Sequence, residues 1–352
     1  MRTKSAQKGF SLLVLYVLLC MHCGSFAQSK SLRQYYYWTN QAELAICDSN
    51  YQRANEYFAK AFTYKFPFAS HLRTAYHLNT HITHNEDNIL HYAYMFCLRG
   101  DGEYAIAEYW RADTNNAQLI DKLQLMADTT HCQSHDTIVQ KKLEKIIETD
   151  QSYRHHRQPT AQEDSLNRSN IKAIKELFKT YPHLNEVTIG NYFWMYLGVP
   201  ALHFVQAGNY SLQKVLKKQV NKGELEASAY MSLEDNYYWY KKMKRNKRSV
   251  DPNQYAQNHL YCYEIGNTLF ITYPTNIKRV NRNRKKLGVA ETFEEMAKKR
   301  IWEFQNDYNW HVVNHLGYGS DEETAQKAER VKQEIDAEHA KGNFLRMYYD
   351  KK

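Results

Sequence analysis

Long apolar runs are almost absent from this chain of 352 residues. The one sustained run, residues 10–20, is too short for an ordinary transmembrane helix, which needs about 20 apolar residues. No later segment offers such a run. We therefore expect a soluble mature protein with no membrane span.

That early run has the features of a secretory signal peptide. Basic residues precede it, and Ser25-Phe26-Ala27 follows it as a small-x-small cleavage site. We expect residues 1–27 to be removed and the mature protein to be periplasmic or secreted. Neither cysteine in this segment follows a small residue, as a lipoprotein cysteine does, so cleavage is favoured over lipidation.

Cysteine is sparse, and its spacing excludes the common cysteine chemistries. Four of the six cysteines lie beyond residue 27, and they form neither a CxxC pair nor a set with zinc-ligand spacing. One disulfide could form in an oxidising compartment, but a chain of this size does not need it, and the sequence leaves the pairing open. The four residues are Cys47, Cys97, Cys132 and Cys262.

Motifs of familiar active sites are also missing. The chain has no G-x-S-x-G elbow, no H-E-x-x-H helix and no glycine-rich phosphate loop. His131 and His135 would share one face of a helix, but Thr129, Thr130 and Ser134 favour a loop there, and no third ligand is near. We therefore expect no metal and no cofactor.

The charge of the chain is only mildly basic. Its formal net charge of +9 falls to +6 once residues 1–27, with three basic and no acidic residues, are removed. This excess is too weak to indicate nucleic acid, and an exported protein does not need the basic run at 241–248 as a nuclear signal. We expect that run to be a solvated loop or helix end, and we expect no nucleic-acid partner.

Tyrosine, by contrast, is abundant: 29 Tyr stand against 14 Phe and 6 Trp. A tyrosine buries its ring while its hydroxyl still forms a hydrogen bond. The excess therefore has two interpretations. Tyrosines packed between helices are favoured over a dedicated polar groove for a sugar or peptide.

Residues 32–140 have the spacing of paired helices. Apolar residues recur every three or four positions in 51–62 and again in 72–97, with Phe66-Pro67 as a helix stop. Asn50–Pro67 resembles the second half of a tetratricopeptide repeat, and Asn85–Gly100 resembles a looser copy. Two repeats cannot cover their own apolar ends. We expect this arm to pack on the rest of the chain and to contact a protein or peptide partner.

Residues 141–352 are predicted to form a second, mainly α-helical module. Two β-prone runs flank Gly266-Asn267, which predicts one β-hairpin near 261–272. Thr292 and Glu295 have the spacing of a capping box at the start of a helix. The predicted fold class is mainly α: tetratricopeptide-like helical hairpins packed on an α-helical C-terminal module with one small β-hairpin.

From Asp150 onward the chain resembles a family of bacterial domains known only as a domain of unknown function. The family often has Leu-x-Asp-Arg and Tyr-Gly-Thr-Gln where this chain has Leu233-x-Asp235-Asn236 and Tyr255-Ala256-Gln257-Asn258. The family has no settled activity, so the resemblance implies no catalytic role. The other matching elements are Asp150-Gln151-x-x-Arg154, Ile189-Gly190 with His203, Gly223-Glu224, and the segment Val280–Gly288, which contains Arg284.

The polar residues of these elements define the candidate site. A histidine held by a carboxylate can act as a general base, so His203 with Asp150 or Asp235 is the candidate catalytic group. A structural role for the same residues, in which Asp150 and Arg154 form a salt bridge within a helix and His203 is buried, is the favoured alternative. Candidate binding residues are Gln151, Arg154, Tyr255 and Arg284.

Two functions are therefore open. The favoured hypothesis is an exported bacterial protein that binds a ligand or acts as a scaffold in the periplasm. The alternative is a small hydrolase with a His–carboxylate centre at His203. We lean towards a protein that is not an enzyme.

Overall fold

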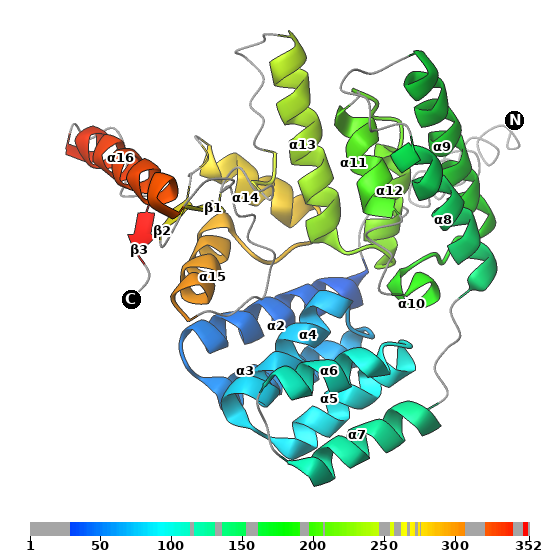
Figure 1. Ribbon diagram of the computed structural model, residues 1–352, viewed down its shortest axis with the longest axis vertical. Helices are drawn as coiled ribbons and strands as arrows, with labels where there is room; N and C mark the ends of the chain where they lie inside the picture. The colour runs from blue at the N-terminus through cyan, green and yellow to red at the C-terminus, as the bar shows by residue number, and fades with distance from the viewer. Residues whose placement is uncertain are drawn as a thin grey trace, which may run out of the picture.

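A computed structural model describes most of the chain, and in the described part the protein is mainly α-helical, as predicted (Figure 1). The signal segment, the His131–His135 pair and Arg154 lie outside the described residues. The described residues are 29–112, 116–130, 136–152, 161–190, 197–206, 208–245, 254–256, 262–265, 268–271, 274, 276–306, 321–340 and 348–350.

The N-terminal arm consists of packed helices at the bottom of Figure 1. Helix α3 begins at Asn50, whose side chain accepts a hydrogen bond from the Arg53 amide, and it ends before Phe66-Pro67, as predicted. Gly100, at φ 79°, follows the end of α5. The helices are α2 (Lys30–Cys47), α3 (Tyr51–Tyr64), α4 (Ala69–His77), the π-helix η1 (Leu78–Thr83), α5 (Glu86–Leu98), α6 (Gly102–Arg111) and α7 (Ala117–Thr129).

The second set of helices begins at α8, so the expected boundary at 140/141 falls inside this helix. Val139 and Leu143 of α8 belong to the same apolar core as α9, α11 and α12. Gly223, at φ 76°, ends α12 as the sequence predicts. The helices are α8 (Thr137–Ser152), α9 (Ala161–Thr180), α10 (Glu186–Ile189), α11 (Val199–Gln206), α12 (Gln213–Lys222), α13 (Ala227–Arg245), α14 (Ile277–Lys286), α15 (Phe293–Gln305) and α16 (Asp321–Ala340).

A small antiparallel sheet lies beside α14, α15 and α16 (Figure 1). Strands β1 (Cys262–Ile265) and β2 (Thr268–Ile271) pair with Cys262 opposite Ile271, in the segment where the sequence predicts a hairpin. Strand β3 (Tyr348–Asp350) adds to β2, with Thr268 opposite Asp350, and no sequence signal predicts it. The buried side of β2 packs with α14 and α15, so the sheet completes a third, smaller core.

Helix α2 belongs to two cores at once. Its first half contributes Leu32, Tyr35 and Tyr36 to the core of the second helical set, and its second half contributes Ala42 and Ile46 to the core of the arm. The Tyr36 hydroxyl also accepts a hydrogen bond of 3.0 Å from the amide of Ala227, at the start of α13. The arm therefore packs on the module, as the sequence analysis expects, and α2 carries much of that contact.

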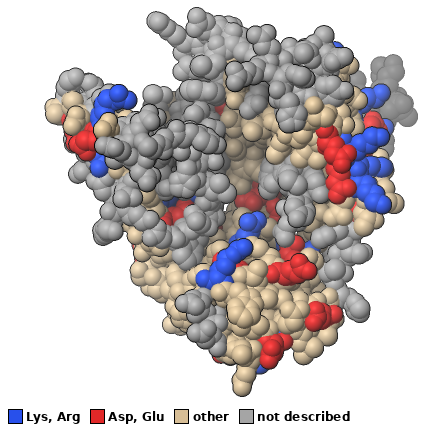
Figure 2. All heavy atoms as spheres, in the orientation of Figure 1, with Lys and Arg blue, Asp and Glu red and all other residues tan. Residues whose placement is uncertain are grey.

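The described surface shows neither a membrane helix nor a separation of charge on the face in view. Among the described residues, no helix combines the length and the apolar character needed to cross a bilayer. On the face shown in Figure 2, basic and acidic side chains lie side by side over α8 and α9. This part of the surface is of mixed charge rather than of one sign.

Candidate functional site

The structure brings His203 and Asp150 together. Asp150 lies near the end of α8 and His203 lies on α11, and the distance from His203 Nδ1 to Asp150 Oδ2 is 2.5 Å. The Asp150 side chain is 0% exposed, whereas the imidazole is 17% exposed. Gln151 donates from Nε2 to the same Asp150 oxygen at 2.9 Å. Three of the predicted site residues therefore share one hydrogen-bonded group.

This pair can orient one imidazole. If Nδ1 of His203 donates its proton to the buried Asp150 carboxylate, the ring is fixed and Nε2 keeps its lone pair. A carboxylate in this position also stabilises the protonated ring. The geometry thus meets the first requirement of a general base.

The surroundings of His203 provide less. Three cavities are described in the resolved part of the chain, and His203 lines none of them. The cavity beside α11 is lined by Ala201, Phe204 and Val205 but measures only about 20 Å³, which is too small for a substrate. Among the described residues, no group of three or more His, Cys, Asp and Glu side chains is arranged to hold a metal.

Asp235 does not fill the catalytic role considered for it. It is 0% exposed, and its Oδ1 accepts hydrogen bonds from the amides of Gln254 and Tyr255 at 2.9 and 2.8 Å. A buried carboxylate that receives two backbone N–H groups fixes a loop on the helix that carries it. The structure therefore gives Asp235 an anchoring role in place of the predicted catalytic one.

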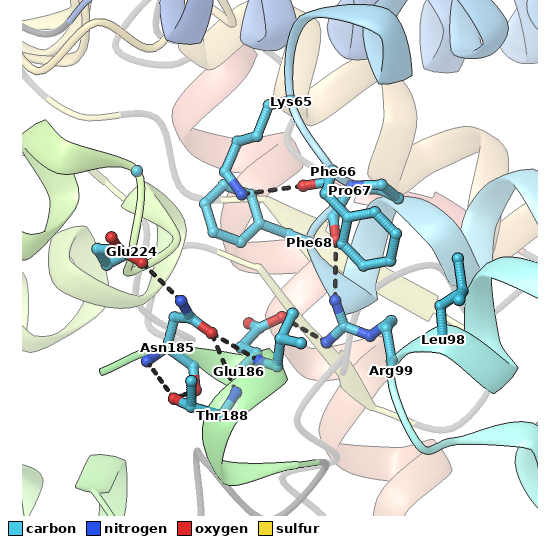
Figure 3. A pocket seen from close by; sticks show the side chains of 12 residues that line it. Lys65, Phe66, Pro67, Phe68, Leu98, Arg99, Asn185, Glu186, Thr188 and Glu224 are labelled. Carbon is cyan, nitrogen blue, oxygen red and sulfur yellow. Dashed lines mark hydrogen bonds and ion pairs between the residues drawn. The ribbon is translucent and has the colours of Figure 1, made fainter. Parts of the chain in front are cut away.

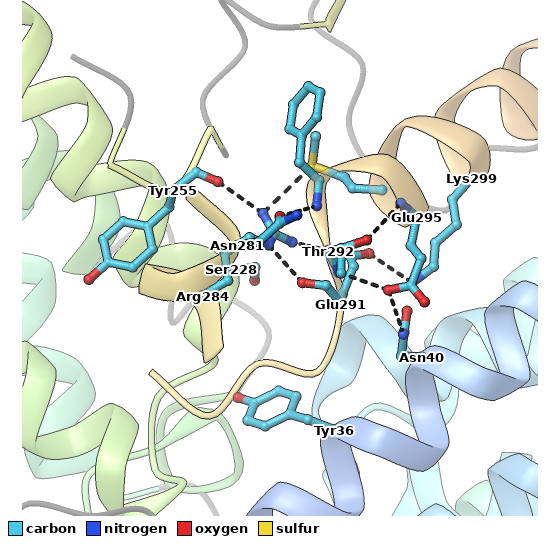
Figure 4. A network of polar contacts seen from close by, with 12 residues as sticks. Tyr36, Asn40, Ser228, Tyr255, Asn281, Arg284, Glu291, Thr292, Glu295 and Lys299 are labelled. Atoms are coloured by element: carbon cyan, nitrogen blue, oxygen red, sulfur yellow. Dashed lines mark hydrogen bonds and ion pairs between the residues drawn. The ribbon is translucent and has the colours of Figure 1, made fainter. Parts of the chain in front are cut away.

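Arg284 and Tyr255, both predicted as binding residues, belong to the same anchor (Figure 4). Arg284 is 0% exposed; it donates to the Tyr255 carbonyl at 3.1 Å and to the carbonyl and carboxylate of Glu291. Ala256 follows at φ 51°, where the resembled family has glycine, and φ in this range favours glycine. Both residues therefore serve the structure, and the prediction that they bind a ligand is corrected.

Glu291 also leads to a buried ammonium group at the contact between α15 and α2 (Figure 4). Lys299 is 2% exposed and binds Glu291 at 2.7 Å and Glu43 on α2. Burial lowers the pKa of Lys299, but the carboxylates of Glu291 and Glu43 raise it more, so its pKa lies above the usual value. This row of alternating charges joins the C-terminal helices to the arm.

The largest of these cavities lies between the arm and the module (Figure 3). Its volume is about 400 Å³. The arm supplies the segment between α3 and α4 and the end of α5, and the module supplies the start of α10 and the turn after α12. The lining residues are Lys65, Phe66, Pro67, Phe68, Leu98, Arg99, Asn185, Glu186, Val187, Thr188, Gly223 and Glu224.

Arg99 connects the two walls of this cavity. Its guanidinium is 1% exposed and donates to the Pro67 carbonyl at 2.9 Å, to Glu186 Oε2 at 3.1 Å and to Asp101 at 3.4 Å. Glu186 Oε2 also accepts from the Ala69 amide at 2.9 Å. The pair therefore fixes the N-terminus of α4, the 67–68 segment and α10 relative to one another.

Glu224 stands on the module side of the cavity (Figure 3). Its two oxygens accept hydrogen bonds from Asn185 Nδ2 at 2.6 Å and from His183 Nδ1 at 2.9 Å. Asn185 in turn caps α10 through the amides of Val187 and Thr188. The position of Glu224 is thus set by the same residues that start the helix.

Lys65 stands on the arm side. Its Nζ donates to the Phe66 carbonyl at 2.9 Å and lies 4.1 Å from the centre of the Phe68 ring. Burial lowers the pKa of Lys65 to about 8, although the carboxylates of Glu186 and Glu224 oppose this shift. Among the described residues, none places a carboxylate oxygen within 4.0 Å of this amine.

The sequence analysis reaches only part of this cavity. It singles out the Gly223-Glu224 turn, but Lys65, Arg99 and Glu186 carry no motif and come from segments far apart in the chain. Phe66-Pro67, used there as a helix stop, is the one signal that marks the arm side.

Comparison with known proteins does not extend this picture: no family model, no curated protein and no solved structure matches the chain. Both family resemblances therefore stay predictions. The functional argument depends on the residues of the chain itself.

Proposed function

We propose that this is an exported binding protein, periplasmic or secreted, whose ligand occupies the cavity between arm and module. The observation that carries the proposal is the cavity of about 400 Å³ with Lys65 and Glu224 on opposite walls. Small-molecule sites are typically concave, about 300–1,000 Å³ in volume, and apolar apart from a few polar groups. Sites between domains are common because two bodies enclose a ligand better than one surface does.

A filled cavity tests this function. Val187→Trp places a large ring in the lining, so it is expected to abolish binding of any ligand that uses the cavity. The measurement is saturation-transfer NMR on the purified full chain with a panel of amino acids, dipeptides, monosaccharides, carboxylates and amines. We expect at least one class to bind the wild-type protein and to lose its signal in the variant.

The matched control is Ile138→Trp, because Ile138 is 61% exposed on α8 and lines none of the three cavities described. Binding should survive in this control. If no class binds, or if binding persists in Val187→Trp, the cavity is not a ligand site and the proposal fails.

The arm gives the protein a second surface for a partner. Trp110 on α6 and Tyr94 on α5 are 59% and 46% exposed, and exposed aromatic residues are enriched where proteins bind each other. We include contact with a protein or peptide through this arm in the proposed function as its scaffold component.

The alternative is a hydrolase that uses His203 as a general base. The observation in its favour is the 2.5 Å contact with a buried Asp150, which leaves one edge of the ring exposed. A general base contributes about 10²–10⁴-fold to a rate. This function requires a substrate to approach Nε2 of His203.

Ester hydrolysis tests the alternative. With 4-nitrophenyl acetate as the probe, a hydrolase would lose at least 100-fold in kcat/KM on His203→Asn and on Asp150→Asn, since Asp150 orients the ring. His183→Asn is the control, because His183 is 78% exposed and can react only as a surface imidazole. We expect all three variants to match the wild type, which would remove the hydrolase; a selective loss at His203 and Asp150 would establish it.

A further inference from the structure

The charges that line the cavity cancel. Lys65 and Arg99 supply two positive charges, and Glu186 and Glu224 supply two negative ones. A ligand with a net charge would therefore bring an uncompensated charge into a site that is partly shielded from water, which is costly. An electrically neutral ligand fits this balance.

The four charges are not equivalent. Arg99 and Glu186 form an ion pair of 3.1 Å and neutralise each other. Lys65 has only the Phe66 carbonyl and two aromatic rings as close partners, and Glu224 receives hydrogen bonds from an amide and an imidazole. Lys65 and Glu224 are therefore the opposite charges left to meet a ligand, one on each side of the cavity (Figure 3).

The amine of Lys65 is also held at a cost. Since burial lowers its pKa to about 8 from a model-compound value of 10.5, its protonated form destabilises the folded protein at neutral pH. The penalty is fully present below pH 8 and fades as the pH rises towards 10.5. A carboxylate placed on this amine would supply the missing ion pair and relieve the penalty.

The remaining wall is apolar. Phe66, Phe68, Leu98 and Val187 line the cavity between the two charges, and a ligand must cover these side chains to exclude water. A molecule that carries only charges would leave them exposed. The lining thus calls for an apolar body between two charged ends.

We propose that the cavity binds a zwitterion with an apolar body, an amino acid or short peptide, with its carboxylate on Lys65 and its ammonium group at Glu224. This inference rests on the proposed function and names its ligand class. It also assigns Lys65 and Glu224 as the residues that distinguish the two ends of the ligand.

Isothermal titration calorimetry at pH 7 tests the ligand class with a matched set of probes. Phenylalanine and alanyl-phenylalanine carry both charges, 3-phenylpropanoate carries only the carboxylate, and 2-phenylethylamine carries only the ammonium group. We expect at least one of the zwitterions to bind at least tenfold more tightly than either single-charge analogue.

Variants then assign the ends. Lys65→Met is expected to weaken binding of the zwitterion at least tenfold and to leave 2-phenylethylamine unchanged, while Glu224→Gln does the reverse for the two single-charge probes. Lys65→Arg should retain most of the affinity because it keeps the charge. Lys60→Met is the control: Lys60 lies on the same helix, over the Trp38 ring at 3.8 Å, and does not line the cavity.

Three results would overturn the inference: neither zwitterion binds, a single-charge analogue binds as tightly, or Lys65→Met has no effect. Its failure is distinct from failure of the proposed function. If a sugar, carboxylate or amine of the NMR panel binds in a manner that Val187→Trp abolishes, the cavity is a ligand site for another class. If nothing binds, both proposals fail together.

Discussion

Replacing Lys299 by methionine is expected to lower the free energy of unfolding by about 3–5 kcal/mol. Lys299 is 2% exposed and lies between the carboxylates of Glu43 and Glu291. Methionine keeps most of the apolar stem but leaves Glu43, itself 4% exposed, as a buried carboxylate without its ammonium partner. The cost arises mainly from that unpaired charge and much less from lost attraction.

The adjacent residue provides the control. Lys298 binds Asp48 at 2.6 Å, but the two side chains are 48% and 62% exposed, so water screens the pair. Lys298→Met should change the unfolding free energy by about 0–1 kcal/mol. Chemical denaturation measures both variants, and equal losses from the two would contradict a buried ionic contact at Lys299.

A double-mutant cycle separates the causes. If the loss comes from the uncompensated Glu43, then Glu43→Gln should cost less in the Lys299→Met background than in the wild type, because the buried charge is already unpaired there. Strict additivity would instead mean that the two side chains do not interact.

The second large effect is expected at Arg99. Arg99→Met should also lower the unfolding free energy by about 3–5 kcal/mol, since it leaves the buried carboxylates of Asp101 and Glu186 and the Pro67 carbonyl without their common donor. Because Arg99 joins both walls of the cavity, the variant should also lose ligand binding. Thermal and denaturant unfolding together with the titration measure the two effects.

Arg111→Met is the matched control for Arg99. Its guanidinium binds Glu108 at 2.8 Å but is 68% exposed, so its removal should cost about 1 kcal/mol or less. A loss at Arg99 no larger than this would mean that water solvates the Arg99–Glu186 pair in solution. The junction between arm and module would then be looser than described above.

The helical fold was predictable because its signals are local. The apolar spacing of 51–62, the stop at Phe66-Pro67 and the capping box of Thr292 and Glu295 each depend on neighbours within a few residues, and each is confirmed. The pairing of β3 with β2 was not predictable, because Tyr348 and Phe270 meet across 78 positions and no turn connects them. The dual role of α2 was hidden for the same reason.

The site divides along the same line. The pairing of His203 with Asp150 could be proposed because both residue types recur in elements of one resemblance, and the contact is confirmed. Asp235 and Arg284 look equally functional in sequence, yet they are buried anchors, since a polar residue type does not reveal its exposure. Lys65 and Glu186 gave no signal because their function depends on the contact between two distant segments.

The position of α2 in both cores also determines the order in which the chain can complete its structure. During synthesis α2 emerges first, but its Tyr36 must await Ala227, 191 residues later, and its Glu43 must await Lys299, 256 residues later. Contacts across such long loops form late because closing the loop costs entropy that only native packing offsets. The helix that is made first is thus finished last, and a nascent chain that stops before α15 has no ammonium group to place on Glu43.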